Sequence, residues 1–520
     1  MNKRLYLAFL VLLLAGIIVA IGSRFYRSEP EYQGKTLSSW LAEVENRSDW
    51  QFPDQEKVRK AVKQIGTNAI PFLLETLEAE DAEVKGKVAG WLNHTFRLKI
   101  KVQSPSEVRD QARLGFLVLG RDAEAAIPAL ALALTNRNDN LAYAAGECLW
   151  AIDSTNCVSA LLNALTNANR QAQDRAISLL ERMGHKATAA GPLLLSRVED
   201  ENFRPRWPVM FALANIGCEP QTVVPIASRW LTDTNRGVRA SAALCLAILS
   251  PAAVSAIPAL KVAMQDTNSL VRNSAARALI RVQCEMHEGG IIRGPKDERK
   301  IALVFTGHEF AEGGEVMLDE LLRHQAKASF FLTGKFLANP QLAHLVGRIA
   351  SEGHGLGPHS YQHLLYCDWT DPKKTLVTHD EFMLDLNANL RLVDHSGAER
   401  TRPAYFLPPY EQYNREIADW SKGLSVTLIN FTPGTRANAD YTGETDKNFV
   451  SSQAIFDSIV KREREDPHGL NGFILLLHLG SGPGRADKFH ARFGELLDYL
   501  GGKGYQFVRV DELLEPKGTP

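Results

Sequence analysis

The pattern of apolar and polar residues changes twice along this chain. Residues 5–22 form one uninterrupted apolar run. Between residues 31 and 284, apolar residues recur at positions i, i+3 and i+4, which is the spacing of amphipathic helices. Between residues 300 and 515, short apolar runs alternate with helical patterns. The pattern therefore predicts a multidomain protein with an N-terminal apolar segment, an all-α region and then an α/β region.

The apolar run lies within residues 1–30 and follows Lys3 and Arg4. The positive charges before it favour insertion into a membrane with the rest of the chain exported. We expect an uncleaved single-pass membrane anchor, because the run is longer than the usual hydrophobic region of a signal peptide. The alternative is a cleaved signal peptide, for which Ala20-Ile21-Gly22 offers small residues at a cleavage site. Both alternatives predict that the bulk of the chain is extracytoplasmic, either membrane-anchored or secreted into the periplasm.

The all-α region, residues 31–284, repeats itself. A marker position recurs in aligned segments, and the last three intervals are 33 residues each. The marker residues are Pro71, Pro128, Ser159, Pro192, Pro225 and Pro258. In a typical unit, proline at the first helical position opens a helix, and a polar Asn or Asp turn leads to a second helix. Because one helical pair cannot bury its apolar face alone, the units are expected to stack into a solenoid.

This region resembles HEAT repeats in a short form, so a HEAT-like α-solenoid is the fold that we expect for residues 31–284. Solenoid surfaces usually bind other macromolecules, and a protein partner is expected on this one. The region carries no catalytic constellation, because its histidines and carboxylates lack partners at ligand spacing. Chemistry is therefore expected in the C-terminal part of the chain.

The repeat ends before residues 285–299, where Gly-Gly, Gly-Pro and a run of charges predict a linker. Beyond the linker, apolar runs alternate with helical patterns. The runs cover residues 301–305, 328–334, 355–360, 404–409, 426–431, 473–479 and 505–510. Strands that alternate with helices predict a parallel sheet, either an α/β barrel or a doubly wound sheet. In either architecture the functional site lies at the carboxyl ends of the strands.

Composition narrows the classes of function. Among 520 residues, 59 Lys and Arg balance 60 Asp and Glu. The chain therefore lacks the basic excess of an electrostatic nucleic-acid binder, and no nucleic-acid partner is expected. The 6 cysteines are scattered without Cys-x-x-Cys spacing. They predict neither a disulfide framework nor a zinc knuckle.

The expected strand ends carry many ionisable side chains. His359, at the end of the third run, and His363, just after it, lie four residues apart, and two imidazoles at this spacing can converge on one divalent metal ion. The other polar residues at the strand ends are Thr306, His308, Glu309, Tyr410, Glu411, Asn430, Asp440 and His478. Packing alone does not explain so many ionisable groups on one rim, so they predict a catalytic or metal site.

At these residues the chain resembles a known family. The segments ALVF, KASFFLTGKFLANP, ASEGHGLGPHSYQH, FLPPYEQYN and FILLLHLG follow, in order, the pattern of polysaccharide deacetylases of the NodB-homology type, carbohydrate esterase family 4. The resemblance covers residues 300–512. It implies a distorted (β/α)7 barrel over residues 300–515, one divalent metal ion, often zinc, and removal of N- or O-acetyl groups from sugars. It also implies that His359 and His363 are metal ligands and that His478 is the general acid.

The chain departs from the family pattern at two places. Family members carry paired aspartates after the first strand, one as a base and one as the third metal ligand, whereas this chain reads Phe305-Thr306-Gly307-His308-Glu309. The arginine before Pro-Pro-Tyr is replaced by Leu407, and the glycine after it by Glu411. Either His308 or Glu309 restores the missing ligand or base, since imidazole and carboxylate both bind zinc and both accept protons, or the site has lost its chemistry.

The leading hypothesis is a metal-dependent hydrolase that removes N- or O-acetyl groups from an extracytoplasmic polysaccharide or cell-envelope glycan. The predicted metal ligands are His359, His363 and His308, a donor set that suits zinc. Glu309, or alternatively Glu411, takes a proton from the metal-bound water. His478 then protonates the departing amine or alkoxide.

Aromatic residues near the strand ends are candidates for substrate binding. Tyr410 lies beside the predicted catalytic groups, and Trp369 and Tyr441 follow two of the strand ends. Aromatic rings of this kind stack on sugar faces, although core packing is the alternative for Trp369 and Tyr441.

Two other classes of function stay open. In the first, the barrel is catalytically impaired and serves as a carbohydrate-binding or scaffold protein, for which the loss of the aspartate pair is the support. In the second, Glu309 and Glu411 form the carboxylate pair of a glycoside hydrolase on the same barrel. Release of acetate, release of reducing ends, or glycan retention without turnover distinguishes the three classes.

Overall fold

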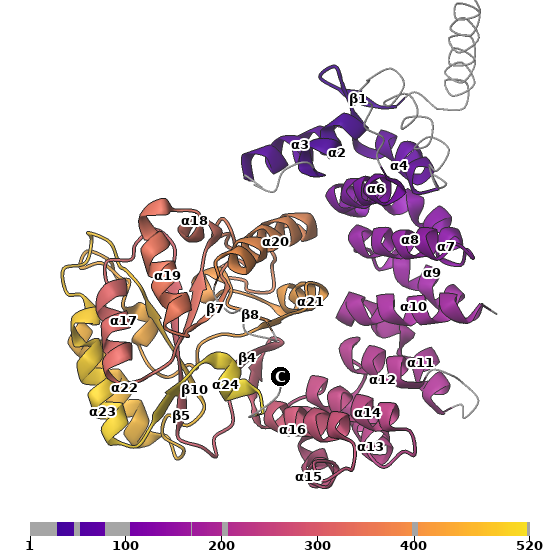
Figure 1. Ribbon diagram of the computed structural model, residues 1–520. Coiled ribbons are helices and arrows are strands. Elements are labelled where there is room, and N and C mark those ends of the chain that lie inside the picture. Colours follow the sequence, from indigo (N-terminus) through magenta and orange to yellow (C-terminus); the bar gives the residue numbers. More distant parts are fainter. Residues whose placement is uncertain are drawn as a thin grey trace, which may run out of the picture. The chain divides into compact units, whose positions relative to one another are not determined.

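The computed structural model describes residues 29–45, 52–78, 104–167, 169–199, 206–397 and 404–516. By internal contacts the chain forms two compact units that divide between Arg175 and Ala176, inside the predicted solenoid. The first unit is helical, whereas the second contains further helical repeats followed by an α/β region (Figure 1). The predicted domain limits at residues 284 and 300 follow a change of pattern and stay predictions.

The first unit is built from stacked helices that follow a short hairpin of β1 (Glu31–Tyr32) and β2 (Lys35–Thr36). Its helices are α2 (Leu37–Glu45), α3 (Phe52–Ile65), α4 (Ile70–Leu77), α6 (Pro105–Leu119), α7 (Ile127–Leu134), α8 (Asp139–Ile152), α9 (Asn156–Leu165) and the start of α10 (Arg170–Met183). Proline lies in the first turn of α4 and α7, where its missing N–H removes no intrahelical hydrogen bond. The repeat logic read from the sequence is therefore present here.

The second unit continues the repeats. Its repeat helices are α11 (Gly191–Glu199), α12 (Arg206–Asn215), α13 (Pro220–Trp230), α14 (Arg236–Ile248), α15 (Ile257–Ala263) and α16 (Ser269–Gln283). Asn235 and Asn268, in the predicted turns, cap α14 and α16 by accepting backbone N–H groups with their side-chain oxygens. Pro225 departs from the expectation, because α13 begins at Pro220 and Pro225 lies inside the helix.

A curled sheet of seven strands follows the repeats, in the order β3-β4-β10-β5-β6-β7, with β11 paired to the first part of β5. The strands are β3 (Glu285–His287), β4 (Gly290–Arg293), β5 (Lys300–Gly307), β6 (Ser329–Leu332), β7 (Gly355–Pro358), β10 (Phe473–His478) and β11 (Gln506–Val508). Strands β5, β6, β7, β10 and β11 are parallel, as predicted. The stretch 285–299 is not simply a linker, because it contributes the antiparallel strands β3 and β4.

Two further parallel strands, β8 (Ala404–Phe406) and β9 (Val426–Leu428), pair with each other. The backbone N–H of Leu407 donates to the carbonyl of Pro358 at 3.4 Å, and that of Asn430 donates to the carbonyl of Ile291 at 2.8 Å. These hydrogen bonds link the pair to β7 on one side and to β4 on the other. The strands therefore curl around a common interior, which is consistent with the predicted distorted barrel.

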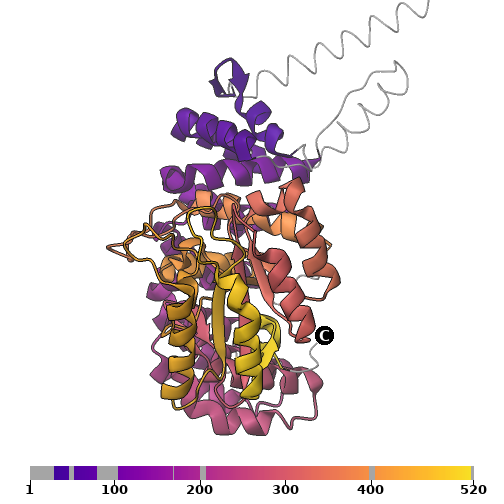
Figure 2. The ribbon, with the colours of Figure 1, turned by 90° about the vertical axis from the view of Figure 1, so that its left-hand side faces the viewer.

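Helices cover the outer face of this sheet (Figures 1 and 2). The helices of this region are α17 (Gly314–Arg323), α18 (Gly334–Leu337), α19 (Ala343–Ser351), α20 (His379–His395), α21 (Arg415–Gly423), α22 (Ser452–Glu465), α23 (Phe493–Gly502) and α24 (Val510–Leu514). Along β5, Leu303 and Phe305 belong to the core beneath the helices, whereas Ala302 and Val304 belong to the core of the interior. The alternation along a strand thus decides which side chains reach the interior.

The last repeats are joined to the α/β region by buried polar contacts. The carboxylate of Glu515 accepts from Arg277 at 2.7 Å, from Arg281 at 3.3 Å and from the hydroxyl of Tyr405 at 3.1 Å. Its side chain is only 8% exposed. Because α16 supplies both arginines and β8 supplies the tyrosine, these contacts fix the last repeat against the sheet.

The predicted N-terminal membrane anchor is corrected by the structure. A membrane span needs about 20 consecutive apolar residues in a helix. No helix among the described ranges is long and apolar enough to cross a membrane. The apolar run at residues 5–22, on which the anchor was predicted, lies outside the described residues.

Candidate active site

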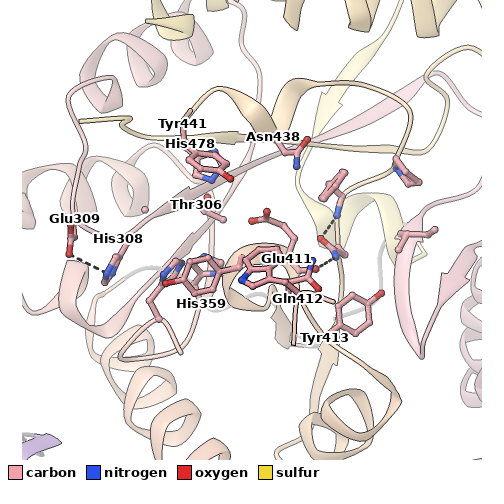
Figure 3. Close-up of a pocket in the computed structure, with 18 of the residues that line it drawn as sticks. Thr306, His308, Glu309, His359, Glu411, Gln412, Tyr413, Asn438, Tyr441 and His478 are labelled. Carbon is pink, nitrogen blue, oxygen red and sulfur yellow. Dashed lines mark hydrogen bonds and ion pairs between the residues drawn. The ribbon is translucent and has the colours of Figure 1, made fainter. Parts of the chain in front are cut away.

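A cavity of about 910 Å³ opens at the carboxyl ends of β5, β7 and β10, where the strand-end rule placed the site. Every residue to which the sequence analysis gave a catalytic, metal-binding or substrate-binding role lines it, and Figure 3 labels several of them. These residues are His308, Glu309, His359, His363, Trp369, Tyr410, Glu411, Tyr441 and His478. Their roles stay predictions, but the structure brings all of them to one cavity.

The loop that carries the two predicted imidazole ligands is held by helix α20. The side-chain oxygen of Asn389 accepts the backbone N–H of His359 at 2.7 Å. The carboxylate of Asp385 accepts the backbone N–H groups of Tyr361 at 2.8 Å and Gln362 at 2.9 Å. Asp385 and Asn389 lie four residues apart on one buried face of the helix, and the sequence analysis did not identify them. The available signal was this polar pair on a face that is otherwise apolar.

Both imidazoles of this loop are held in the neutral form. The Nδ1–H of His359 donates to the carbonyl of Leu407 at 2.7 Å, so its Nε2 is the nitrogen left for the cavity. Burial lowers the pKa of His359 to about 3 and the pKa of His363 to about 2. Neutral imidazoles are the form that binds metal ions, so these two residues fit two ligand positions.

The third predicted ligand, His308, does not converge with them. Its ring stacks on that of His363, with centroids 4.5 Å apart and planes only 14° from parallel. An imidazole binds a metal through a lone pair in its own ring plane, so two stacked rings do not share one ion. The described part of the chain contains no group of three or more metal-binding side chains.

The space beside this end of β5 is filled by apolar side chains. A Cβ at Gly307 would lie 2.9 Å from side-chain atoms of Leu332 and Phe336. A carboxylate ligand at this position would therefore require its neighbours to move. The residues present offer two donors for a divalent metal, but they do not form the three-ligand site that the family pattern implies.

The end of β10 carries a complete proton-transfer pair. The Nδ1 of His478 lies 2.7 Å from one carboxylate oxygen of Asp440, and the backbone N–H of His478 donates to the other oxygen at 2.8 Å. Burial acts to lower the pKa of His478, but the adjacent Asp440 carboxylate outweighs it, and the pKa is raised overall. The sequence placed Asp440 on the rim without identifying this partner. The arrangement fits a general acid or base that a buried carboxylate orients.

Glu411 reaches into the same cavity from the loop after β8, on the side facing Thr306 and His478 (Figure 3). Both Tyr410 and Glu411 adopt left-handed backbone conformations, with φ of 56° and 55°. The side-chain N–H of Asn430 donates to the carbonyl of Glu411 at 2.8 Å and holds this turn. Strained conformations of non-glycine residues concentrate at functional sites, where the surroundings enforce them.

Burial raises the pKa of Glu411 to about 7, with the nearby His478 acting in the opposite direction. A carboxyl group with such a pKa both accepts and donates protons near neutrality, as a general base must. Glu309, the first-choice base from the sequence, differs in its setting. Its side chain is 67% exposed at the edge of the cavity, 3.7 Å from the Nε2 of His308.

The three aromatic side chains predicted to bind substrate all line the cavity. The ring of Tyr410 lies 4.3 Å from that of His363, and the ring of Tyr441 lies 5.0 Å from that of His478. Trp369 contacts Tyr410 edge-on at 6.0 Å. Trp369 is 57% exposed and Tyr441 46% exposed, so neither is packed in a core. Exposed rings beside catalytic groups are suited to stacking on a sugar.

Comparison with known proteins agrees with these motifs. Residues 293–429 match the family model of polysaccharide deacetylases, and residues 191–280 match that of HEAT repeats. A peptidoglycan-N-acetylglucosamine deacetylase of Bacillus cereus is 23% identical over 222 residues, which cover 43% of this chain and 70% of that protein. The peptidoglycan-N-acetylmuramic acid deacetylase PdaA of Bacillus subtilis is 27% identical over 227 residues, which cover 43% of this chain and 74% of that protein.

An uncharacterized protein of Bacillus subtilis, YlxY, is 28% identical over 229 residues, and the match covers 60% of its length. Among solved structures, a carbohydrate esterase family 4 pseudoenzyme from Bacillus anthracis aligns over 44% of this chain and 70% of its own chain, at 18% identity and a TM-score of 0.35. The polysaccharide deacetylase model thus matches the region after the repeats, and the HEAT model matches the last repeats.

Proposed function

We propose, on the premise that the region after the repeats belongs to the polysaccharide deacetylase family, that this chain is a hydrolase that removes acetyl groups from a polysaccharide. The observation that carries the proposal is the meeting of Glu411 with the His478–Asp440 pair in one cavity. Hydrolysis of an acetyl group needs one group that takes a proton from water and one that gives a proton to the leaving atom. This cavity contains both kinds of group.

In the proposed mechanism, Glu411 takes the proton of the attacking water. Its carboxyl is ready for this role near neutral pH, because burial brings its pKa to about 7. His478 gives a proton to the departing oxygen or nitrogen. Asp440 keeps the imidazole oriented through the 2.7 Å contact at Nδ1, which leaves Nε2 for the substrate.

The substrate class that we propose is an acetylated glycan of the cell envelope. The relatives from Bacillus cereus and Bacillus subtilis are named as peptidoglycan deacetylases. Exposed Trp369 and Tyr441 would stack on sugar rings at the cavity, and Tyr410 would contact the sugar that carries the acetyl group. An extracytoplasmic location is part of this proposal, since such glycans lie outside the cytoplasm.

A divalent metal would add polarisation of the acetyl carbonyl. His359 and His363 are the two residues that fit it, whereas the stacked His308 does not complete the site. The proposed proton transfers are therefore assigned to Glu411 and His478 alone. This shortage of ligands also favours a second candidate function, glycan binding without turnover.

Measurement of acetate release distinguishes a deacetylase from a protein that binds glycans without turnover. Purified protein is incubated with N-acetylated chitooligosaccharides, peptidoglycan and O-acetylated xylan, and free acetate is measured. We expect release that is lost in His478→Gln and kept in His344→Gln, a surface control on α19 whose side chain is 60% exposed. Retention of a glycan with no acetate from any substrate would leave the binding function, and new reducing ends without acetate would indicate a glycosidase.

A further inference from the structure

Thr306 lies at the last position of β5 that is paired with β10, and its register partner there is His478. Neighbouring strands lie about 4.8 Å apart, and side chains at partner positions in a parallel pair point to the same face. In β5, Ala302 and Val304 face the interior, so Thr306 falls on the interior face as well. The strand pairing alone therefore puts the Thr306 side chain next to that of His478.

The same alternation applies to β10. Ile474 and Leu476 belong to the interior core, and His478 follows them at the same spacing. Thr306 and His478 both line the cavity, and Figure 3 draws them beside each other at its upper wall. A hydroxyl group and a carboxylate-bound imidazole are thus neighbours at the carboxyl ends of two parallel strands.

The described residues give the Thr306 hydroxyl no hydrogen bond that would account for a polar group at this buried position. The residue is 3% exposed, and within the described ranges its Oγ1 is buried without a hydrogen bond. A buried hydroxyl without a partner costs about 1–3 kcal/mol, so valine would be the better residue here for stability alone. An unsatisfied polar atom at a cavity wall indicates a partner that arrives with the reaction.

We propose that Thr306 is the nucleophile of a Thr306–His478–Asp440 triad, and that the acetyl group passes through an ester on this threonine before water releases it. This inference rests on the proposed deacetylation and adds a covalent step to it. The triad has the chemical order of a nucleophilic hydroxyl, an imidazole base and an orienting carboxylate. Its members come from β5, from β10 and from the turn before α22.

The first half-reaction transfers the acetyl group to the protein. The Thr306 oxygen attacks the acetyl carbonyl carbon while its proton moves to the Nε2 of His478. The tetrahedral adduct then collapses, the bond from carbon to the sugar oxygen or nitrogen breaks, and His478 returns that proton to the departing atom. The deacetylated sugar leaves, and the acetyl group remains as a threonine ester with no net change in charge.

The second half-reaction needs water and a separate base. Glu411 faces Thr306 across the cavity and takes a proton from water, which attacks the ester carbonyl (Figure 3). The bond from the acetyl carbon to the Thr306 oxygen breaks, and the oxygen recovers a proton from Glu411. The product leaves as acetic acid, which gives its remaining proton to solvent to become acetate, and both residues return to their starting states. The two acid–base groups of the cavity thus serve one half-reaction each.

The hydroxyl is reached by rotation of one side-chain bond. Thr306 lines the cavity, although its Oγ1 is covered in the resting arrangement. Rotation of χ1 from one staggered well to another exchanges the positions of the methyl group and the hydroxyl. No hydrogen bond holds Oγ1 within the described residues, so nothing polar has to break for this rotation.

The test traps the ester. In Glu411→Gln the second half-reaction lacks its base, so the acetyl group should accumulate on Thr306. The full-length protein is mixed with p-nitrophenyl acetate or with an acetylated oligosaccharide, quenched in acid, digested and examined by mass spectrometry. We expect one acetyl group on the peptide that contains Thr306 in Glu411→Gln, and none in the Thr306→Val, Glu411→Gln double variant.

Single variants of Thr306 complete the test. Thr306→Val keeps the shape and loses no hydrogen bond, so it should fold normally and lose at least about 10³-fold in acetate release. Thr306→Ser keeps the hydroxyl and should retain most of the activity. A Thr306→Val variant that releases acetate at the parental rate, with no acetyl peptide in Glu411→Gln, would overturn the covalent route and leave the proposed deacetylation standing. No acetate and no acetyl peptide from any donor would overturn both.

Discussion

The ends of the paired strands β5 and β10 differ in how their polar groups are hydrogen-bonded. At the end of β10, His478 has its side chain and its backbone N–H bound to Asp440. At the end of β5, the hydroxyl of Thr306 has no hydrogen-bond partner among the described residues, Gly307 has no side chain, and His308 is stacked on the ring of His363. The pair proposed to transfer protons is hydrogen-bonded, whereas the described residues at the end of β5 provide no third ligand to join His359 and His363. The proposed proton transfer and metal binding can therefore be tested separately.

The largest effect is expected from the two glutamates that compete for the role of base. Glu411→Gln should lower kcat for acetate release by about 10²–10⁴-fold, because it removes the base proposed to activate water. Glu309→Gln should change it less than about threefold, because that side chain is 67% exposed. Acetate-release kinetics on both variants give the ratio. A larger loss of activity in Glu309→Gln would indicate that Glu309, just after β5, is the base.

Replacement of Gly307 by the missing carboxylate tests whether the end of β5 is closed. Gly307→Asp places a Cβ 2.9 Å from atoms of Leu332 and Phe336, and overpacking of this kind costs about 1–3 kcal/mol. Urea unfolding should show the loss, and Leu332→Ala in the same chain should recover part of it relative to Leu332→Ala alone. A neutral Gly307→Asp that also gains a bound zinc ion would mean that this strand end is still open for a metal.

The metal content of the protein tests whether the end of β5 contributes a ligand to a metal site. With two converging imidazoles, we expect less than one zinc ion per chain after dialysis, because structural and catalytic zinc sites normally supply at least three protein ligands. Elemental analysis of the parent, of His359→Ala and of His308→Ala measures this. One tightly bound ion in the parent that both variants lose would contradict the stacked arrangement of His308 and show that it turns to bind.

The smallest effect concerns stability and pH. The pKa of Glu411 is raised by burial to about 7, from about 4.3 in an unfolded chain, so between these values the folded state binds more protons. Stability contributed by this group is present below about pH 4 and is lost as the pH rises to about 7. Glu411→Gln does not titrate, so it should raise the Tm by roughly 2 °C at pH 8 relative to the parent. The difference should vanish at pH 4, as calorimetry at both values can check.

Much of the fold was predictable because its signals are local. The apolar runs 301–305 and 473–479 correspond to β5 and β10, because short apolar runs between helical patterns are typical of buried strands. The strands β3 and β4 were missed within the predicted linker at 285–299. Their Gly-Gly turn and flanking charges look like a linker, but β3 and β4 form a local antiparallel hairpin, and the pairing of Arg293 in β4 with Phe473 in β10 joins this hairpin to the sheet. That distant pairing leaves no local mark in the sequence.

The sequence was enough to predict which residues lie on the rim of the site, but not how their side chains are oriented. The rule that parallel strands end at one edge was enough to group His359, Glu411 and His478. The sequence could not tell that Asp440 binds His478, because Asp440 lies in a loop 38 residues before this last residue of β10, and their approach depends on the whole sheet. The left-handed backbone at Glu411 was equally hidden, although it aims this side chain into the cavity. The orientation of the side chains in the site could therefore be learned only from the three-dimensional structure.

The buried carboxylate of Glu515 has a practical consequence for how this chain can be divided. A fragment that starts at residue 285 would keep Glu515 and Tyr405 and discard Arg277 and Arg281, leaving the negative charge with no cation beside it. Such a fragment would lose these ion pairs and the packing of α16 beside Glu515, and with them part of its stability. A recombinant fragment is therefore expected to be more stable if it carries helix α16 along with the α/β region.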